Sequence, residues 1–331
     1  MNKIISTLFF LLTLTLPIHD AVAEGKRVVF IRYQIPISHF TTVIDGFKKT
    51  MALQGYKEGE QVEYIDVLTR SADKSSIPDV LKAVNEWKDK ADMIITCGWV
   101  SMPAREILKE TRTPQLFVPV LKSVAMKILP ATNGQPGTNI SGIYLMYPPE
   151  KILRLASLLI PGIKHYAYVY NSNIPADMIF KSTYEQLAIA DHHGITIHFL
   201  DIALGVDQVL TELRKRNIQA FGGIVGSFQK RQELAASNLP VITSFTLDIE
   251  KGDLEKYVQE GNIVAGLFNP FRYCGEQAAE MTADIFNDKL SIEQTVPRPA
   301  RQIAFINVNA AARLNMQVPF AALESVDIVI K

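Results

Sequence analysis

Several polar and aromatic side chains directly follow the apolar segments of this chain, where strands are expected to end. Ser101 and Ser227 stand near expected helix N-termini, where hydroxyl and backbone N–H groups can donate to a carboxylate. Lys122 would add a positive charge, and Trp99 and Phe228 are suited to holding an apolar or aromatic body. We therefore predict a site for a small molecule. The predicted ligand-binding residues are Tyr33, Gln34, Trp99, Ser101, Lys122, Tyr170, Asn171, Ser227, Phe228, Asn269 and Phe271.

These residues also have simpler explanations. Ser101 and Ser227 are equally suited to being ordinary helix N-caps. Aromatic residues dominate protein cores, so about half of those near strand ends are explained by core or hinge packing alone.

Catalytic and metal-binding motifs are missing from the sequence. It has no Gly-x-Ser-x-Gly elbow, no phosphate-binding Gly-x-x-x-x-Gly-Lys, no Gly-x-Gly-x-x-Gly and no Cys-x-x-Cys. His192 and His193 lie at an expected helix end, where histidine usually interacts with the last carbonyls, and His198 lies on the next strand. The glycine cluster at 222–226 lies in an expected strand and indicates tight packing. We predict no enzyme activity, no cofactor and no metal site.

The elements that must position the site occur twice in the chain. Residues 27–120 and residues 165–245 show the same order of strands and helices. The matching strand ends are Tyr33, Asp66 and Gly98 in the first copy, and Tyr170, Asp201 and Gly226 in the second. Two similar lobes that face each other make a cleft, and such a cleft can enclose a small molecule.

The strands are short apolar blocks, such as 93–96 and 116–118, without polar alternation. Such strands are typical of parallel sheets covered on both faces, so we predict an α/β fold with two doubly wound parallel-sheet lobes. The carboxyl ends of the strands then share one edge of each sheet, where ligands bind. Helices are expected over 39–54, capped by Ser38, and over 271–289, and strands over 263–268 and 303–307. Crossings between the lobes are expected at 140–147, 263–270 and about 296–302.

The N-terminus has the pattern of an export signal peptide. Lys3 precedes the apolar residues 4–16, and Ala21-Val22-Ala23 is a small-x-small cleavage site. The apolar stretch is shorter than the roughly 20 residues of a membrane-spanning helix. A buried core helix is the alternative, which Pro17 and the cleavage site disfavour. We predict cleavage before Glu24 and a periplasmic protein.

Charge and cysteine content restrict the partners and the covalent structure. The 34 Lys and Arg residues balance the 34 Asp and Glu residues, so nothing in the charge favours nucleic acid. The two cysteines, Cys97 and Cys274, are interpreted as buried thiols, with a disulfide as the alternative in an oxidising compartment.

Several ordered segments resemble one known family. The segment 136–143, Pro-Gly-Thr-Asn-Ile-Ser-Gly-Ile, is similar to the Pro-Gly-x-Asn-(Val/Ile)-(Thr/Ser)-Gly segment of ABC-transporter substrate-binding proteins of the tryptophan/phenylalanine-binding type. Further similar pieces, in the same order, are Gly46-Phe47, 55–59, 161–164, Tyr170-Asn171, 273–279, 306–314 and Val318-Pro319. The resemblance covers residues 26–331 and implies a type I periplasmic-binding fold, with a hinge of three crossovers. It implies lobe 1 at 24–143, completed by about 269–300, and lobe 2 at 144–268, completed by about 301–331, after a signal peptide at 1–23.

The departures from the family pattern bear on the ligand. Family members typically have Asp-Pro where this chain has Lys122-Ser123, and often carry acids where Ser227-Phe228 and Phe245 stand. An alternative is that Asp177 or Asp248 replaces them. We expect an anionic, amino-acid-like or aromatic solute that meets Lys122, with Arg32 as a second candidate cation, and that requires no ammonium. The resemblance implies a monomer that delivers its solute to an ABC permease; the alternative is a periplasmic sensor that signals to a membrane protein.

Overall fold

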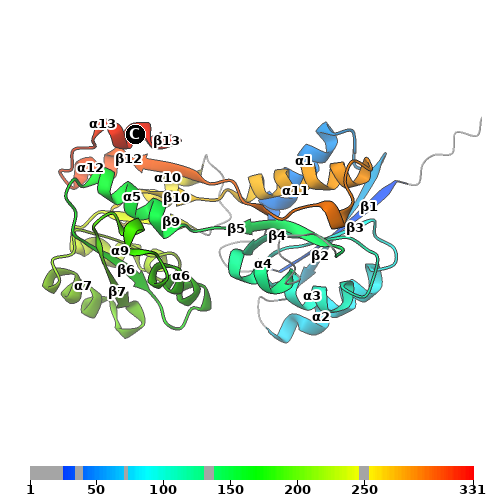
Figure 1. The fold of residues 1–331 in the computed structure, drawn as a ribbon, viewed down its shortest axis with the longest axis horizontal. Helices are drawn as coiled ribbons and strands as arrows, with labels where there is room; N and C mark the ends of the chain where they lie inside the picture. Colours follow the sequence, from blue (N-terminus) through cyan, green and yellow to red (C-terminus); the bar gives the residue numbers. More distant parts are fainter. Residues whose placement is uncertain (1–24, 34–39, 71–73, 130–137, 246–252) are drawn as a thin grey trace, which may run out of the picture.

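The chain forms two lobes, each built around its own β-sheet, which lie side by side along the long axis of the molecule (Figure 1). The computed structural model describes residues 25–33, 40–70, 74–129, 138–245 and 253–331. We call the part around the six-stranded sheet lobe 1 and the part around the seven-stranded sheet lobe 2. The predicted α/β class with two parallel-dominated sheets is confirmed.

Lobe 1 has a fully parallel sheet in the order β11-β5-β4-β3-β1-β2. Its strands are β1 (Lys26–Tyr33), β2 (Val62–Thr69), β3 (Met93–Thr96), β4 (Gln115–Leu121), β5 (Ile140–Leu145) and β11 (Arg298–Pro299). Its helices are α1 (Thr41–Leu53), α2 (Ile77–Trp87), α3 (Ser101–Leu108), α4 (Lys122–Ile128) and α11 (Phe271–Phe286). Short 3₁₀ turns are η1 (Lys74–Ser76), η2 (Gly98–Val100) and η7 (Ile292–Gln294).

Lobe 2 has the strand order β13-β12-β10-β9-β8-β6-β7, with β12 antiparallel to β10. Its strands are β6 (His165–Tyr170), β7 (Thr196–Asp201), β8 (Ala220–Gly222), β9 (Val241–Phe245), β10 (Ile263–Phe268), β12 (Ile303–Asn307) and β13 (Ile328–Ile330). Its helices are α5 (Pro149–Leu159), α6 (Pro175–Glu185), α7 (Val206–Lys215), α8 (Gly226–Gln229), α9 (Arg231–Leu234), α10 (Leu254–Val258), α12 (Val308–Arg313) and α13 (Phe320–Glu324). Its 3₁₀ turns are η3 (Ile189–His192), η4 (Ile202–Leu204) and η5 (Ala235–Ser237).

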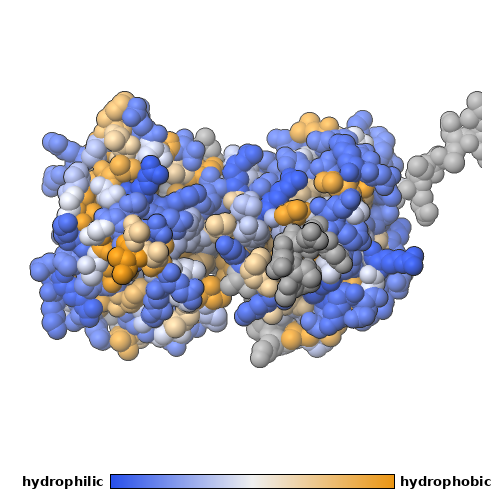
Figure 2. Space-filling model, in the orientation of Figure 1, coloured by the Kyte–Doolittle hydropathy of each residue, from blue (hydrophilic) through white to orange (hydrophobic). Residues whose placement is uncertain are grey.

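The described chain passes between the two sheets three times. The first connection follows β5 and leads into α5, the second lies between β10 and α11, and the third lies between β11 and β12 (Figure 1). The C-terminal strand β13 pairs with β12, so the end of the chain belongs to lobe 2. Figure 2 shows that the surface is indented between the two lobes on the lower side of the view.

Close packing between α1 and α11 explains two segments that carried the family resemblance. A Cβ atom added at Gly46 would lie 2.3 Å from the carbonyl oxygen of Arg272, and one added at Gly275 would lie 2.0 Å from that of Val43. The two helices therefore touch backbone to backbone, and only glycine fits at these contacts. Phe47, on the same face of α1, is fully buried against Phe30 of β1.

Asn139 gives the Pro-Gly-x-Asn segment a structural role. Its side-chain amide donates to the carbonyls of Leu108, Thr111 and Thr113 at 2.7–3.0 Å, and its oxygen accepts from Arg105 at 2.6 Å. Carbonyls at a helix C-terminus lack intrahelical donors, so this one side chain satisfies the end of α3 and the loop behind it. Asn139 thus ties the start of β5 to the end of α3 within lobe 1.

Some element boundaries differ from the expectations. The strands predicted over 93–96, 263–268 and 303–307 are confirmed, whereas α1 and α11 end at Leu53 and Phe286, earlier than predicted. The predicted cap Ser38 lies outside the described residues. β4 continues through Pro119, where its pairing with β5 shifts register, because proline cannot donate to a ladder. β8 ends at Gly222, so the prediction of a strand running to Gly226 is wrong. The chain is tightly packed at this end of the strand, since a Cβ added at Gly222 would lie 2.2 Å from the hydroxyl of Tyr166.

Cys97 and Cys274 are buried and are not joined in a disulfide. The prediction of two buried thiols is therefore confirmed. Among the described residues, no helix is long and apolar enough to cross a membrane.

Candidate ligand-binding site

Three predicted site residues come together in one aromatic cluster at the carboxyl edge of the lobe 1 sheet. The ring of Tyr33 lies 6.3 Å from Trp99 and 5.1 Å from Phe40, and Phe40 stacks on Phe271 at 5.6 Å. Gly98 permits this packing, because its backbone has φ +67° and an added Cβ would lie 2.6 Å from the Tyr33 hydroxyl.

Within this cluster the predicted residues differ in exposure. Tyr33 and Phe271 are buried, whereas Trp99 is half-buried. Burial raises the pKa of Tyr33 to about 12, against the effect of a backbone hydrogen bond with Trp99. Trp99 is therefore the member best placed to meet a ligand, and the other two support it. Gln34, next in sequence to Tyr33, lies outside the described residues.

A pocket of about 450 Å³ lies where the two lobes meet beside the first connection. Lobe 1 contributes Lys122 and Met126 from α4, the connection contributes residues 145–150, and lobe 2 contributes Phe180 and other residues of α6. The lining is mainly apolar, with polar groups on Lys122, Glu150, Thr183 and Gln186, which is typical of ligand pockets. A hollow of about 570 Å³ beside β7 is larger, but it belongs to lobe 2 alone and lies away from the connections.

Lys122 and Glu150 place opposite charges on the lining of this pocket. Lys122 is exposed, as a predicted anion-binding residue at the rim would be. Glu150 lies in the first turn of α5 and was missed from the sequence. Glu150 thus gives this pocket an acid that does not lie at any of the strand ends considered from the sequence. Arg32, the second candidate cation, is committed to Asp66 through two contacts of 2.8 Å.

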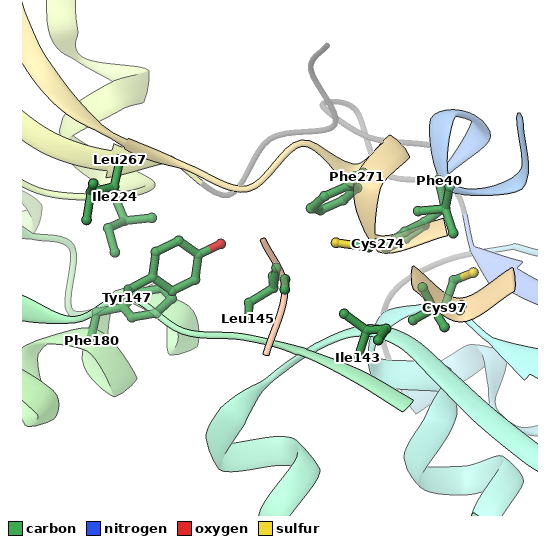
Figure 3. Packing of buried hydrophobic residues seen from close by; sticks show 14 of the residues in the cluster. Phe40, Cys97, Ile143, Leu145, Tyr147, Phe180, Ile224, Leu267, Phe271 and Cys274 are labelled. Carbon is green, nitrogen blue, oxygen red and sulfur yellow. The ribbon is translucent and has the colours of Figure 1, made fainter. Parts of the chain in front are cut away.

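Tyr147, in the first connection, is a further site residue that was missed. Its ring packs edge-on against Phe180 at 4.6 Å, and its hydroxyl points away from Phe180 toward lobe 1 (Figure 3). Burial raises the pKa of Tyr147 well above its ordinary value, and Cys274 adds to this. The hydroxyl is buried and has no hydrogen-bond partner among the described residues. Its position before Pro148-Pro149 in an expected crossing was the only sequence feature that could have indicated it.

The side chain of Asn269 joins two of the connections. Its amide donates to the carbonyls of Ala300 and Arg301 at 3.3 and 3.0 Å, and it is almost fully buried. Gln302 joins the third connection to the first in the same way, donating to the Met146 carbonyl at 2.6 Å. The structure therefore places Asn269, predicted as a ligand-binding residue, inside the hinge region.

Ser101 is fully buried and its hydroxyl is already used. It donates at 3.1 Å to the carbonyl of Thr96 at the end of β3. It makes no N-cap hydrogen bond either, because Val100 occupies that position without a side-chain cap. The N-cap interpretation of Ser101 is therefore wrong, since its hydroxyl ties α3 back to β3. Its role in ligand binding stays a prediction.

The predicted residues of lobe 2 lie in two groups. Asn171 follows β6, and its side-chain oxygen accepts from the backbone N–H of Asn173 at 2.9 Å, whereas Tyr170 packs near Lys181. Phe228 is half-buried and packs edge-on against Phe245 of the lobe 2 core at 5.2 Å. The buried Ser227 precedes it, and the guanidinium of Arg231 lies 4.5 Å from the Phe228 ring. Phe228 and Trp99 thus belong to separate clusters, so the hypothesis that they hold a ligand together gains no support from this structure.

Asp177, the acid considered as a replacement, is fully buried on α6. Its carboxylate accepts from the backbone N–H groups of Asn171, Val225 and Gly226 at 2.9–3.0 Å. Burial raises its pKa, and these three donors oppose the rise. Asp177 therefore offers no free carboxylate to a ligand. Asp248 lies outside the described residues.

Among the described residues, no group of three or more His, Cys, Asp and Glu side chains could hold a metal ion. His198 does contact a histidine, His165 on the neighbouring strand, with ring nitrogens 3.1 Å apart. Burial lowers the pKa of His198, with His165 and Arg216 adding to the effect. The pair lies at the opposite edge of the sheet from Asn171, because His165 begins β6 and Asn171 follows it.

Comparison with known proteins assigns the chain to a family. The family model described as ABC transporter substrate binding protein matches residues 33–330, so the chain belongs to this family. A search of curated proteins found no match. The predicted family is thereby confirmed.

Solved structures share the fold at low sequence identity. A ligand-free, open substrate-binding protein with adhesive properties from Clostridium difficile has a TM-score of 0.71 and 19% identity, covering 93% of this chain and 100% of that one. The ABC domain in complex with L-Trp from Streptococcus pneumoniae has a TM-score of 0.66 and 15% identity, covering 92% and 100%. A conserved domain protein from Vibrio cholerae has a TM-score of 0.65 and 18% identity, covering 93% and 99%.

Proposed function

We propose that this protein is the periplasmic solute receptor of an ABC importer and that it captures a small solute between its two lobes. The observation that carries the proposal is the pocket shared by both lobes beside the first connection, with Lys122 and Tyr147 on its lining. The family assignment supports the importer role. Signalling to a membrane protein is the alternative outcome, and it would use the same pocket.

The proposed solute is a small amino-acid-like or aromatic molecule that bears a carboxylate. Lys122 would meet the carboxylate at the rim, and the apolar lining around Tyr147 and Phe180 would hold the body. Glu150 gives the same pocket a group that pairs with an ammonium, so a zwitterion also fits its chemistry. Two solved structures of this fold are complexes with L-Trp and with benzoate, so these two compounds are the first to test.

The proposed organisation follows the three connections. The lobe 1 sheet includes β5 as far as Leu145, so we assign residues 24–145 and about 269–300 to lobe 1, and residues 146–268 and about 301–331 to lobe 2. This moves the boundary expected at residue 143 by two residues. Rotation about the three connections would close the cleft without breaking either core. A cleaved leader at 1–23 would deliver a monomer to the periplasm, and N-terminal sequencing of exported protein should begin at Glu24.

Thermal-shift measurements on the mature chain test the binding proposal. A panel of amino acids and organic acids should contain a compound that stabilises the fold by about 2.7 kcal/mol at 100 times its Kd. Lys122→Ala should weaken binding of that compound. Lys127→Ala on the same helix should leave binding unchanged, because Lys127 is exposed and does not line the pocket. Binding that is indifferent to Lys122 but lost in a Trp99→Ala variant would move the site to the aromatic cluster.

Solution scattering tests the closure. The radius of gyration should fall when the stabilising compound is added. An unchanged radius at saturation would contradict a closing cleft. Co-purification with a permease encoded beside this protein would support import, and with a histidine kinase or cyclase would support sensing.

A further inference from the structure

The buried carboxylate of Asp177 connects two loops of lobe 2. One oxygen accepts from Val225 N–H at 2.9 Å. The other accepts from Gly226 N–H at 2.9 Å and from Asn171 N–H at 3.0 Å. Asn171 directly follows β6, whereas Val225 and Gly226 lie between β8 and α8. One side chain on α6 therefore holds the ends of two strands.

These strand ends share one edge of the lobe 2 sheet. β6 and β8 are parallel neighbours, so their carboxyl ends share the edge at which an open α/β sheet binds ligands. Four predicted site residues, Tyr170, Asn171, Ser227 and Phe228, lie within two residues of the three bonded amides. Their backbone positions consequently depend on the same carboxylate.

The backbone around the Asp177 carboxylate is packed closely enough to surround an anionic group. An added Cβ at Gly226 would lie 2.9 Å from the carboxylate and 2.6 Å from the Cβ of Asn171, so glycine lets the loop approach. Three converging N–H donors match the lone pairs of an ionised carboxylate, which accepts only. Charge-assisted hydrogen bonds of this kind are about twice as strong as neutral ones. Such amide nests elsewhere bind the anionic groups of ligands.

We propose that Asp177 is the positioning residue for the lobe 2 half of the ligand site, and that its carboxylate occupies the amides that a ligand carboxylate would otherwise use. This rests on the proposed function in so far as the cleft is the binding site. The ligand's anionic group is then left to lobe 1, where Lys122 lies on the pocket rim. The earlier expectation that N–H donors around Ser227 receive a ligand carboxylate is replaced by this assignment.

Hydrogen exchange on the mature chain, without ligand, tests the positioning role. In Asp177→Ala, backbone amides in the segments 168–174 and 222–230 should exchange about 10- to 100-fold faster, both together, since each loses a bond to a charged group. Exchange in β1 and β3 of lobe 1 should not change. Asp207→Ala is the matched control, because Asp207 is an exposed acid in the first turn of the next helix, α7.

Rescue by sodium formate distinguishes a positioning role of the carboxylate from a general structural role. Tens of millimolar formate should restore slow exchange in both segments of Asp177→Ala, because formate refills the place of the carboxylate. It should leave wild type and Asp207→Ala unchanged. A folded Asp177→Ala protein that shows no formate effect, or acceleration in only one of the two segments, would overturn the proposal.

Asp177→Asn decides the matter if the alanine variant does not fold. Its volume is nearly that of Asp, but its NH₂ group must face at least one of the three N–H donors. Exchange should accelerate at least in the segment 222–230, because it donates to both carboxylate oxygens and loses a bond in either orientation of the amide. Formate should not correct it because the space is filled. Wild-type exchange in this variant would sink the proposal. None of these readouts needs a ligand, so they stand apart from a failure of the ligand panel, which bears on the proposed function alone.

Discussion

Replacing Tyr147 by phenylalanine should stabilise the protein in the absence of ligand. The Tyr147 hydroxyl is buried and has no partner among the described residues. Leaving such a group without a hydrogen bond costs about 1–3 kcal/mol. Phenylalanine keeps the edge-on contact of 4.6 Å with Phe180. The free energy of unfolding of Tyr147→Phe should therefore rise by about 1 kcal/mol or more.

Tyr166 provides the matched control. It is also buried, but its hydroxyl donates to the carbonyl of Ile242 at 2.8 Å. Tyr166→Phe should lower the free energy of unfolding by about 0.5–1.5 kcal/mol. Urea denaturation of both variants gives opposite shifts of the midpoint at similar m-values. Destabilisation of Tyr147→Phe by as much as Tyr166→Phe would refute the assignment of an unpartnered hydroxyl.

For ligand binding, the Tyr147→Phe substitution is expected to have the opposite effect to the one on stability. If the solute of the proposed site takes the hydroxyl as a hydrogen-bond partner, Tyr147→Phe should bind that solute about 1 kcal/mol more weakly, roughly five-fold, while the unliganded protein is more stable. Calorimetric titration of both proteins with the compound found by thermal shift measures this. Equal affinities would remove Tyr147 from the site and leave its stability effect intact.

Three further predictions follow from particular contacts. Because Lys122 is exposed, Lys122→Ala should weaken binding of an anionic solute by about 0.2–1 kcal/mol, and this loss should shrink as salt is added. A salt-independent loss of several kcal/mol would mean that closure buries Lys122 together with the anionic group of the solute. The pKa of His198 is lowered in the folded protein, so as pH falls through about 6.5 the unfolded chain takes up a proton that the folded chain resists. The free energy of unfolding should therefore fall in this range and level off below the folded pKa. His198→Gln should flatten this slope in urea midpoints measured from pH 8 to 5, and a slope unchanged by the substitution would exclude His198 as its cause. Asn269→Ala removes two donor contacts between the second and third connections and should lower the free energy of unfolding by roughly 1–2 kcal/mol, with a midpoint equal to wild type as the contrary result.

The sequence alone determined the class of fold. The uninterrupted apolar block 263–268 became a strand with those bounds, because a parallel strand buried on both faces needs apolar residues at every position. The alternation of strands and helices, repeated in two halves, fixed the two-lobed arrangement and the edges at which strand ends meet. Two of the segments that resemble the family contain Gly46 and Gly275, which allow the close contact between α1 and α11. Packing of this kind is local enough to leave a sequence pattern.

Only the tertiary structure decided which strand-end residues share a surface. Ser101 turned its hydroxyl back to Thr96, and Phe228 joined the core of lobe 2, although both follow expected strand ends. Tyr147 and Asp177 carried no motif, since the packing of one against Phe180 and the three backbone donors around the other come from distant segments. Side-chain direction at a strand end is set by the neighbouring loops, and these are brought together only when both lobes have folded.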